Sequence, residues 1–157
     1  MTIHWQPEAE LLTHLDEAVN HILATQKPNG QFGSEPWIST DQNVLLPLAV
    51  AWSREGSAHH HSAAVLDAIV RGGLALEEAQ DEQGMWIFRK KDYSEWGPSV
   101  CLGHTVAGCG PMPAAAARRW ETGLRLGYGG IAQNDMDRLH NIPAHHAMGL
   151  YCAGQSV

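Results

Sequence analysis

The feature that most constrains the fold is an internal repeat. Gln26-Lys-Pro-Asn-Gly-Gln-Phe32 recurs as Gln80-Asp-Glu-Gln-Gly-Met-Trp86, so both segments read Gln-x-x-x-Gly-x-aromatic, and each shared position recurs 54 residues later (26 to 80, 30 to 84, 32 to 86). A weaker third copy without the glycine begins at Gln133. A repeat of this length is typical of architectures in which one small structural unit is stacked on the next.

Each copy of the motif follows a stretch with helical spacing of its apolar residues. These residues are Leu11, Leu12, Leu15, Val19, Ile22 and Leu23 before the first copy, Val65, Leu66, Ile69, Val70, Leu74 and Leu76 before the second, and Trp120, Leu124, Tyr128 and Ile131 before the third. Return helices are predicted over 41–52 and 141–151, the latter capped by Asn141. The pattern therefore predicts an all-α domain of repeated antiparallel helical hairpins.

The hairpins are expected at residues 7–55, 62–110 and 113–155 of a single domain spanning 1–157. The second return helix, expected near 99–107, is the weak point, because glycines and prolines crowd it and the surrounding segment 98–113. Two interpretations stay open for this segment: a long surface loop, or sequence that has been altered away from a helix-forming ancestor.

Composition excludes several classes of protein. With 44% hydrophobic and 17% charged residues in 157, the chain has the balance of a globular domain. The net charge of -7 argues against a nucleic-acid partner. We expect no membrane association, because there is no basic and apolar leader and no apolar run of about 20 residues. Three cysteines at irregular spacing predict no disulfide framework, and a cytoplasmic setting is the expectation.

A helix, a Gln-x-x-x-Gly-aromatic turn and a return helix, repeated at this period, resemble the α/α toroid superfamily. Its members include the six-hairpin glycosidases, the toroid domains of polysaccharide lyases and the terpene cyclase and prenyltransferase toroids. No Asp-Asp-x-x-Asp motif supports the terpenoid branch. Such a toroid has about six hairpins, and three are visible here. The resemblance therefore implies a partial toroid, whose exposed apolar edge would be covered in a homo-oligomer or by a missing second half.

The segment His140–Tyr151 carries the candidate catalytic residues. It loosely resembles the Asn-His-containing helix of heparinase- and alginate-lyase-type toroids, with His145-His146 in place of the adjacent Asn-His pair. The resemblance implies Asn141, His145, His146 and Tyr151 as catalytic candidates for β-elimination. On a helix Asn141 and His145 lie about 40° apart and can converge on one site, whereas Tyr151 is about 120° from His145. The competing interpretation is that Asn141 only caps the helix and the histidines belong to the core.

The connecting segments carry the candidate substrate-binding residues. Trp37 and Trp96 fall outside the repeated positions and are predicted to stack on sugars, and Arg89 is predicted to meet an acidic sugar. Glu35 and Asp41 are the best carboxylate pair for a hydrolase, although acids in loops are usually solvated. Phe32 and Trp86 also lie in these segments, and because they are repeated we expect them to be structural plugs between hairpins.

No cofactor and no metal ion are predicted. The run His59-His60-His61 lies in a turn, and three consecutive histidines cannot all face one ion on regular structure. Cys152 has no identifiable base beside it and is expected to be a small buried residue. Two functions remain: a carbohydrate-active enzyme, lyase-like or glycoside hydrolase-like, acting on an oligosaccharide, and a non-catalytic helical-repeat domain or truncated toroid remnant that serves assembly or binding.

Overall fold

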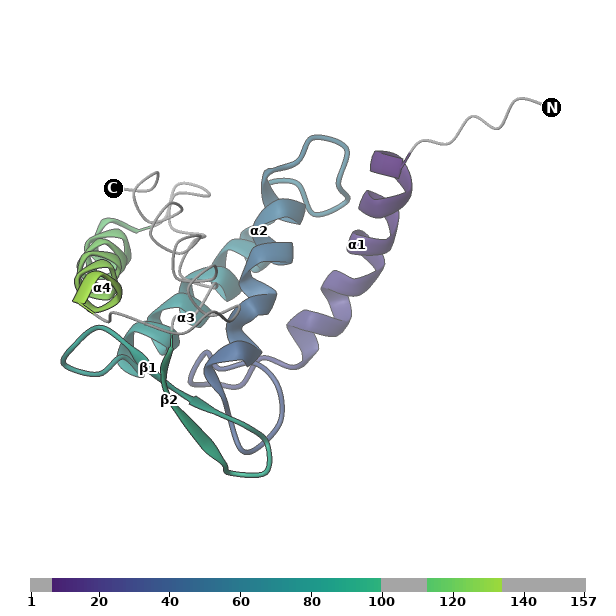
Figure 1. The fold of residues 1–157 in the computed structure, drawn as a ribbon. Coiled ribbons are helices and arrows are strands. Elements are labelled where there is room, and N and C mark those ends of the chain that lie inside the picture. Colours follow the sequence, from purple (N-terminus) through teal and green to yellow (C-terminus); the bar gives the residue numbers. More distant parts are fainter. Residues whose placement is uncertain (1–6, 100–112, 134–157) are drawn as a thin grey trace.

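A computed structural model describes residues 7–99 and 113–133 of the chain. These residues form a mainly helical protein, as the sequence predicts (Figure 1). The elements are α1 (Pro7–Ala24), the 3-10 helix η1 (Ser39–Val44), α2 (Leu45–Ser53), α3 (Ala63–Glu78), β1 (Trp86–Arg89), β2 (Glu95–Ser99) and α4 (Ala114–Gln133). The expected third return helix and most of the second, at 141–151 and 99–107, lie outside the described residues.

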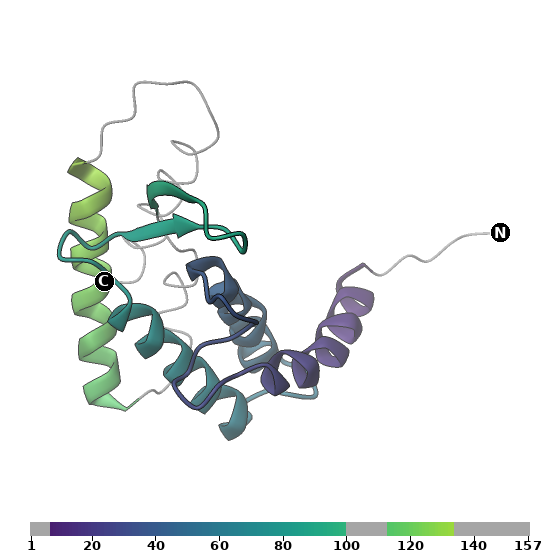
Figure 2. The same cartoon turned by 90° about the horizontal axis from the view of Figure 1, so that it is seen from below.

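Successive helices contact one another in chain order, α1 with α2, α2 with α3, and α3 with α4 (Figure 1, Figure 2). Local sequence explains where they begin. Glu8 and Glu10 place negative charge in the first turn of α1, where the helix dipole is positive. Ser62 caps α3, with its side chain accepting a hydrogen bond from the backbone N–H of Val65. Pro47 is tolerated in α2 because it lies in the first turn, where no intrahelical donor is needed.

The repeated glutamines make the same hydrogen bonds in both copies. The Gln26 side-chain amide donates to the carbonyl oxygen of Gly30 at 3.2 Å and to that of Ala68 in α3 at 2.8 Å. The Gln80 amide donates to Gly84 at 2.9 Å and to Gly123 in α4 at 2.9 Å. Each glutamine therefore closes its own turn and binds it to the next long helix, Gln26 to α3 and Gln80 to α4.

The repeated glycines bring each turn into contact with that same helix. Gly30 and Gly84 have φ angles of 86° and 81°, in the left-handed region that favours glycine. A Cβ on Gly30 would lie 2.3 Å from the carbonyl oxygen of Arg71, and one on Gly84 would lie 2.3 Å from that of Leu126. The turn positions recur after 54 residues and the receiving positions after 55 (68 to 123, 71 to 126). The sequence repeat is thus a repeat of tertiary packing.

The repeated aromatic residues lie in the core, which confirms their predicted structural role. Phe32 is 0% exposed and belongs to the main cluster between α1, α2, α3 and α4. Trp86 is 2% exposed and packs with Leu76 and the partly buried Trp37 in a second, smaller cluster. Its indole N–H donates to the carbonyl oxygen of Leu76 at 2.9 Å.

One part of the sequence interpretation is wrong. The sequence predicts connecting loops for Trp86 and Trp96, but they lie on two strands that pair antiparallel, with Trp86 opposite Ser99 and Arg89 opposite Glu95. The physical reason is the local composition, because the aromatic and β-branched side chains of β1 favour a pleated strand. This β-hairpin occupies the place where a simple loop was predicted.

The turn between α2 and α3 is fastened to α1 by Asp16. Its carboxylate accepts hydrogen bonds from the Ser57 hydroxyl at 2.6 Å and from the Ala58 N–H at 2.8 Å. Burial raises the pKa of Asp16, but these two hydrogen bonds and the nearby His59 together outweigh it, so the pKa is lowered. A single carboxylate thus joins the first helix to the start of the second hairpin.

The histidine run lies in this same turn. The rings of His60 and His61 stack at 3.8 Å, and His61 also packs against Trp52. Among the described residues, no group of three or more His, Cys, Asp or Glu side chains is arranged to hold a metal ion. Within the same part of the chain, none of the helices combines the length and the apolar character needed to cross a membrane.

Candidate functional site

Two connecting segments from different hairpins lie side by side and enclose a pocket of about 210 Å³. The first segment runs from Gly33 to Asp41, between the first Gln-x-x-x-Gly turn and η1, and the second is the β1–β2 hairpin (Figure 1). The pocket is lined by Trp37, Ile38, Ser39, Ala79, Asp81, Met85, Trp86, Ile87 and Arg89. It brings together Trp37 and Arg89, two of the predicted substrate-binding residues.

Two tryptophans line the pocket and differ in their hydrogen bonding. Trp86 is fixed, because its indole N–H is bound to Leu76. The indole N–H of Trp37 is buried and has no hydrogen-bond partner among the described residues. A buried donor without an acceptor carries a free-energy cost of about 1–3 kcal/mol. Of the two tryptophans, Trp37 is therefore the one whose indole N–H is left without a hydrogen-bond acceptor among the described residues.

Arg89 closes the pocket from β1 and is paired across the hairpin. Its guanidinium donates from Nε to Glu95 Oε1 at 2.9 Å, and the two side chains are 42% and 46% exposed. An anionic ligand at Arg89 would have to compete with the Glu95 carboxylate. A ligand can displace Glu95 at a small cost in free energy, because an exposed ion pair stabilises the folded protein by only about 0–1 kcal/mol.

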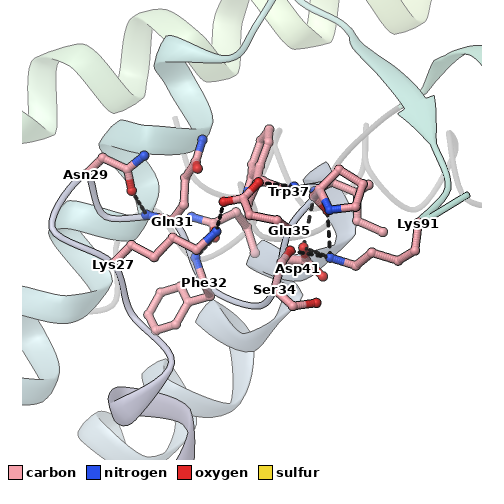
Figure 3. Close-up of polar contacts among 12 residues, drawn as sticks. Lys27, Asn29, Gln31, Phe32, Ser34, Glu35, Trp37, Asp41 and Lys91 are labelled. Atoms are coloured by element: carbon pink, nitrogen blue, oxygen red, sulfur yellow. Dashed lines mark hydrogen bonds and ion pairs between the residues drawn. The ribbon is translucent and has the colours of Figure 1, made fainter. Parts of the chain in front are cut away.

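Lys91 is not among the residues that line the pocket, and its ammonium is bound to groups of the protein. Its ammonium donates to the carbonyl oxygens of Ser34 at 2.8 Å and Pro36 at 2.9 Å, and to Asp41 Oδ2 at 2.5 Å (Figure 3). These three acceptors match the three hydrogens of an ammonium group. The side chain therefore joins the tip of the β-hairpin to the segment that carries Trp37.

Glu35 also stabilises this segment. One carboxylate oxygen of Glu35 accepts from the Lys27 ammonium, and the other accepts from the Trp37 N–H at 3.2 Å (Figure 3). The hydrogen bond and the charge of Lys27 hold the pKa of Glu35 below its usual range. A general acid in a glycosidase needs the opposite, a raised pKa.

Asp41, the other member of the predicted hydrolase pair, has a similar structural environment. Its Oδ2 accepts from the Ile38 N–H at 3.2 Å as well as from Lys91, and its side chain is 16% exposed. Asp41 also lies directly beside Gly33, where a Cβ would come within 2.8 Å of the Asp41 carboxyl carbon. Both carboxylates are thus engaged by lysines and by the backbone of their own segment.

The remaining predicted site residues are not placed by the structure. Asn141, His145, His146 and Tyr151 lie outside the described residues. Trp96 lies on β2, and only its backbone is described. Sequence reasoning missed the contribution of Ile87, Met85 and Asp81 to the pocket. The repeat gives no signal for them, because Asp81 and Met85 occupy positions that differ between the two copies of the motif, and Ile87 follows the shared aromatic residue, where the copies diverge.

The described residues form a mainly helical protein in which two repeated turns are each bound to the helix that follows. No protein-family model matches the chain, and no solved structure matches it. Hyaluronate lyase HylA from Cutibacterium acnes is 29% identical over 115 residues, an alignment that covers 69% of this chain. The chain spans only 14% of the length of that relative. The similarity is therefore distant, and it covers only a small part of that relative.

Proposed function

We propose that this chain is part of an α/α toroid domain of the polysaccharide lyase type and acts on a uronate-containing polysaccharide. The observation that carries the proposal is the 29% identity to a hyaluronate lyase over 115 residues. The docking of Gln26 on α3 and of Gln80 on α4 supports it, because a ring of hairpins needs each unit to bind the next in the same way.

The proposed chemistry is β-elimination. Asn141 and His145 would donate hydrogen bonds to the uronate carboxylate and so make the proton on C5 more acidic. Tyr151 or His146 would remove that proton as the base. The electron pair left on C5 forms the C4–C5 double bond, and the glycosidic oxygen leaves C4 and takes up a proton. The products are an unsaturated uronate and a sugar with a free hydroxyl group.

The pocket lined by Trp37 and Arg89 is suited to bind the sugar of the proposed substrate. Aromatic side chains offer a large apolar face with a polar N–H at its edge, which fits a sugar ring with its hydroxyl groups. Arg89 would meet the carboxylate of an acidic sugar. Whole small ligands occupy pockets of about 300–1,000 Å³, so the 210 Å³ measured here fits a single sugar ring. Trp96 is proposed as a second stacking surface on the same hairpin.

The assay that tests the proposal uses a panel of hyaluronan, chondroitin, alginate and heparin-type polysaccharides. Lyase activity should produce ultraviolet absorbance from the C4–C5 double bond together with new reducing ends. Reducing ends without absorbance would contradict the lyase and favour a hydrolase that uses Glu35 and Asp41. If neither signal appears across the panel, the lyase is excluded and the chain is a non-catalytic helical-repeat domain.

A further inference from the structure

We infer that Lys91 is a positioning residue that holds the two walls of the Trp37/Arg89 pocket at a fixed separation. The inference rests on the proposed function only for the nature of the ligand, a uronate-containing oligosaccharide. Lys91 would control affinity through the shape of the pocket.

The two walls belong to different hairpins. Trp37, Ile38 and Ser39 come from the segment after the first turn, whereas Ile87 and Arg89 come from β1 in the second hairpin. Lys91 follows Arg89 by two residues. It is thus attached to one wall, and its ammonium binds the other, 50 residues away at Asp41.

The acceptors of Lys91 lie directly beside Trp37. The Pro36 carbonyl belongs to the residue before Trp37, and Asp41 also accepts from the N–H of Ile38, the residue after it (Figure 3). The ammonium therefore holds the backbone on both sides of this tryptophan. If the ammonium were removed, the carbonyl groups of Ser34 and Pro36 and the carboxylate of Asp41 would lose their common donor. These groups lie on either side of Trp37, which lines the pocket.

The tip of the β-hairpin presents Lys91 from a rigid turn. The N–H of Lys90 donates to the Ser94 carbonyl at 2.9 Å, and the N–H of Tyr93 donates to the Lys90 carbonyl at 3.0 Å. The Asp92 carboxylate accepts from both the N–H and the hydroxyl of Ser94, at 2.9 and 2.6 Å. A turn fixed by four hydrogen bonds transmits the position of Lys91 to Arg89 on the adjoining strand.

The charge of Lys91 is balanced without contribution from a ligand. Asp41 neutralises it, and the two side chains are 40% and 16% exposed. The three hydrogen bonds of the ammonium lie at the protein surface, where water can replace it, so they contribute little to global stability. Loss of Lys91 is therefore expected to change the pocket much more than the unfolding transition, which separates a positioning role from a merely structural one.

The test compares Lys91→Met, which keeps the length of the side chain but removes the ammonium, with Lys27→Met. Lys27 also pairs with a carboxylate of the segment, Glu35, but it does not reach the second hairpin. Binding of a uronate-containing oligosaccharide is measured by calorimetry, amide exchange is measured at Trp37 and Ile38, and melting is followed by circular dichroism. Lys91→Met should weaken binding by about tenfold and speed exchange at both amides, with little change in melting. Lys27→Met should change binding by less than about twofold.

Lys91→Arg, which retains charge and donors, should restore most of the affinity. Unchanged binding and unchanged exchange in Lys91→Met would overturn the inference. So would a uniform rise in exchange across α1, α2 and α3 with a large fall in melting temperature, because Lys91 would then be a general structural residue. If the wild type binds no oligosaccharide, the proposed function fails, but faster exchange at Trp37 and Ile38 in Lys91→Met alone would still support the coupling of the two walls.

Discussion

The indole ring of Trp120 in α4 lies directly against Gly73 in α3. A Cβ on Gly73 would fall 1.4 Å from Cζ2 of Trp120, so only glycine permits this contact. Trp120 is 1% exposed and joins the main core cluster. A glycine within a helix costs about 1 kcal/mol in helix propensity. At this position the cost is offset by the close approach of the next repeat.

Replacement of Gly73 by alanine should therefore destabilise the protein by about 1–3 kcal/mol, the usual range for overpacking a core. The matched control is Gly129→Ala in α4, where an added Cβ would meet no atom of the described residues within 4 Å. That variant should be neutral or gain up to about 1 kcal/mol from helix propensity. Urea unfolding followed by circular dichroism measures both. A Gly73 variant as stable as the control would contradict the packing of α3 against α4.

The two repeated glutamines should be equivalent in their contribution to stability. Gln26→Ala and Gln80→Ala each leave two carbonyl groups without their side-chain donor. We expect each variant to lose about 1–3 kcal/mol of unfolding free energy. Gln83→Ala is the control, because Gln83 is exposed in the second turn. A large loss of unfolding free energy in one glutamine variant and none in the other would show that the two turns do not contribute equally to stability.

Acid stability should depend on Asp16. Its pKa is lowered in the folded protein, so ionised Asp16 contributes stability above its unfolded pKa, and that contribution is lost as the pH falls through the folded pKa. Asp16→Asn should be less stable than the wild type near neutral pH and should approach it in strong acid. Thermal melting across an acid pH series measures the difference. Glu17→Gln, in the same helix with a side chain 72% exposed, should follow the wild-type curve. If the melting temperatures of the wild type and Asp16→Asn changed in parallel with pH, ionisation of Asp16 would not contribute to stability.

If the wild type proves to be a lyase, His145→Ala should abolish elimination and leave thermal unfolding nearly unchanged, because alanine suits the helix that the sequence predicts over 141–151. Asn141→Ala should also lose activity, but it is a less clean probe, since the loss of a helix cap alone costs about 1 kcal/mol. Initial rates of ultraviolet absorbance and melting curves of the same samples provide the comparison. Full activity in His145→Ala would remove this histidine from the mechanism.

The chain is also expected to self-associate through apolar surface. Leu46 and Val50 are four residues apart on α2 and are 52% and 38% exposed, and Leu11 on α1 is 69% exposed. Sedimentation at micromolar concentration should show a dimer or larger species, and Leu46→Glu should weaken it because a charge would have to be buried. A monomer for the wild type under these conditions would contradict the expectation.

The sequence predicts the helices and the two turns well because their signals are local. Apolar spacing marks α1, α3 and α4, and Gln-x-x-x-Gly-x-aromatic marks the turns. The sequence does not show that Gly73 is needed for packing. Helix propensity counts glycine against a helix, whereas the contact with Trp120 requires glycine at this position. The sequence also assigns the β-hairpin to a loop, and it gives no indication of the role of Lys91. That role depends on Asp41, 50 residues away, and such a contact exists only after folding.

In the hydrogen bond from Gln26 to Ala68, the acceptor follows the donor by 42 residues and is therefore synthesised later. During synthesis at about 5–20 residues per second, the ribosome needs about 2–8 s to add the helix that completes the first turn. The second turn has the same relation to α4, whose Gly123 follows Gln80 by 43 residues. Each turn thus lacks this contact until the following helix emerges, and the apolar residues that the helix will cover are available to chaperones or to misassembly for that interval.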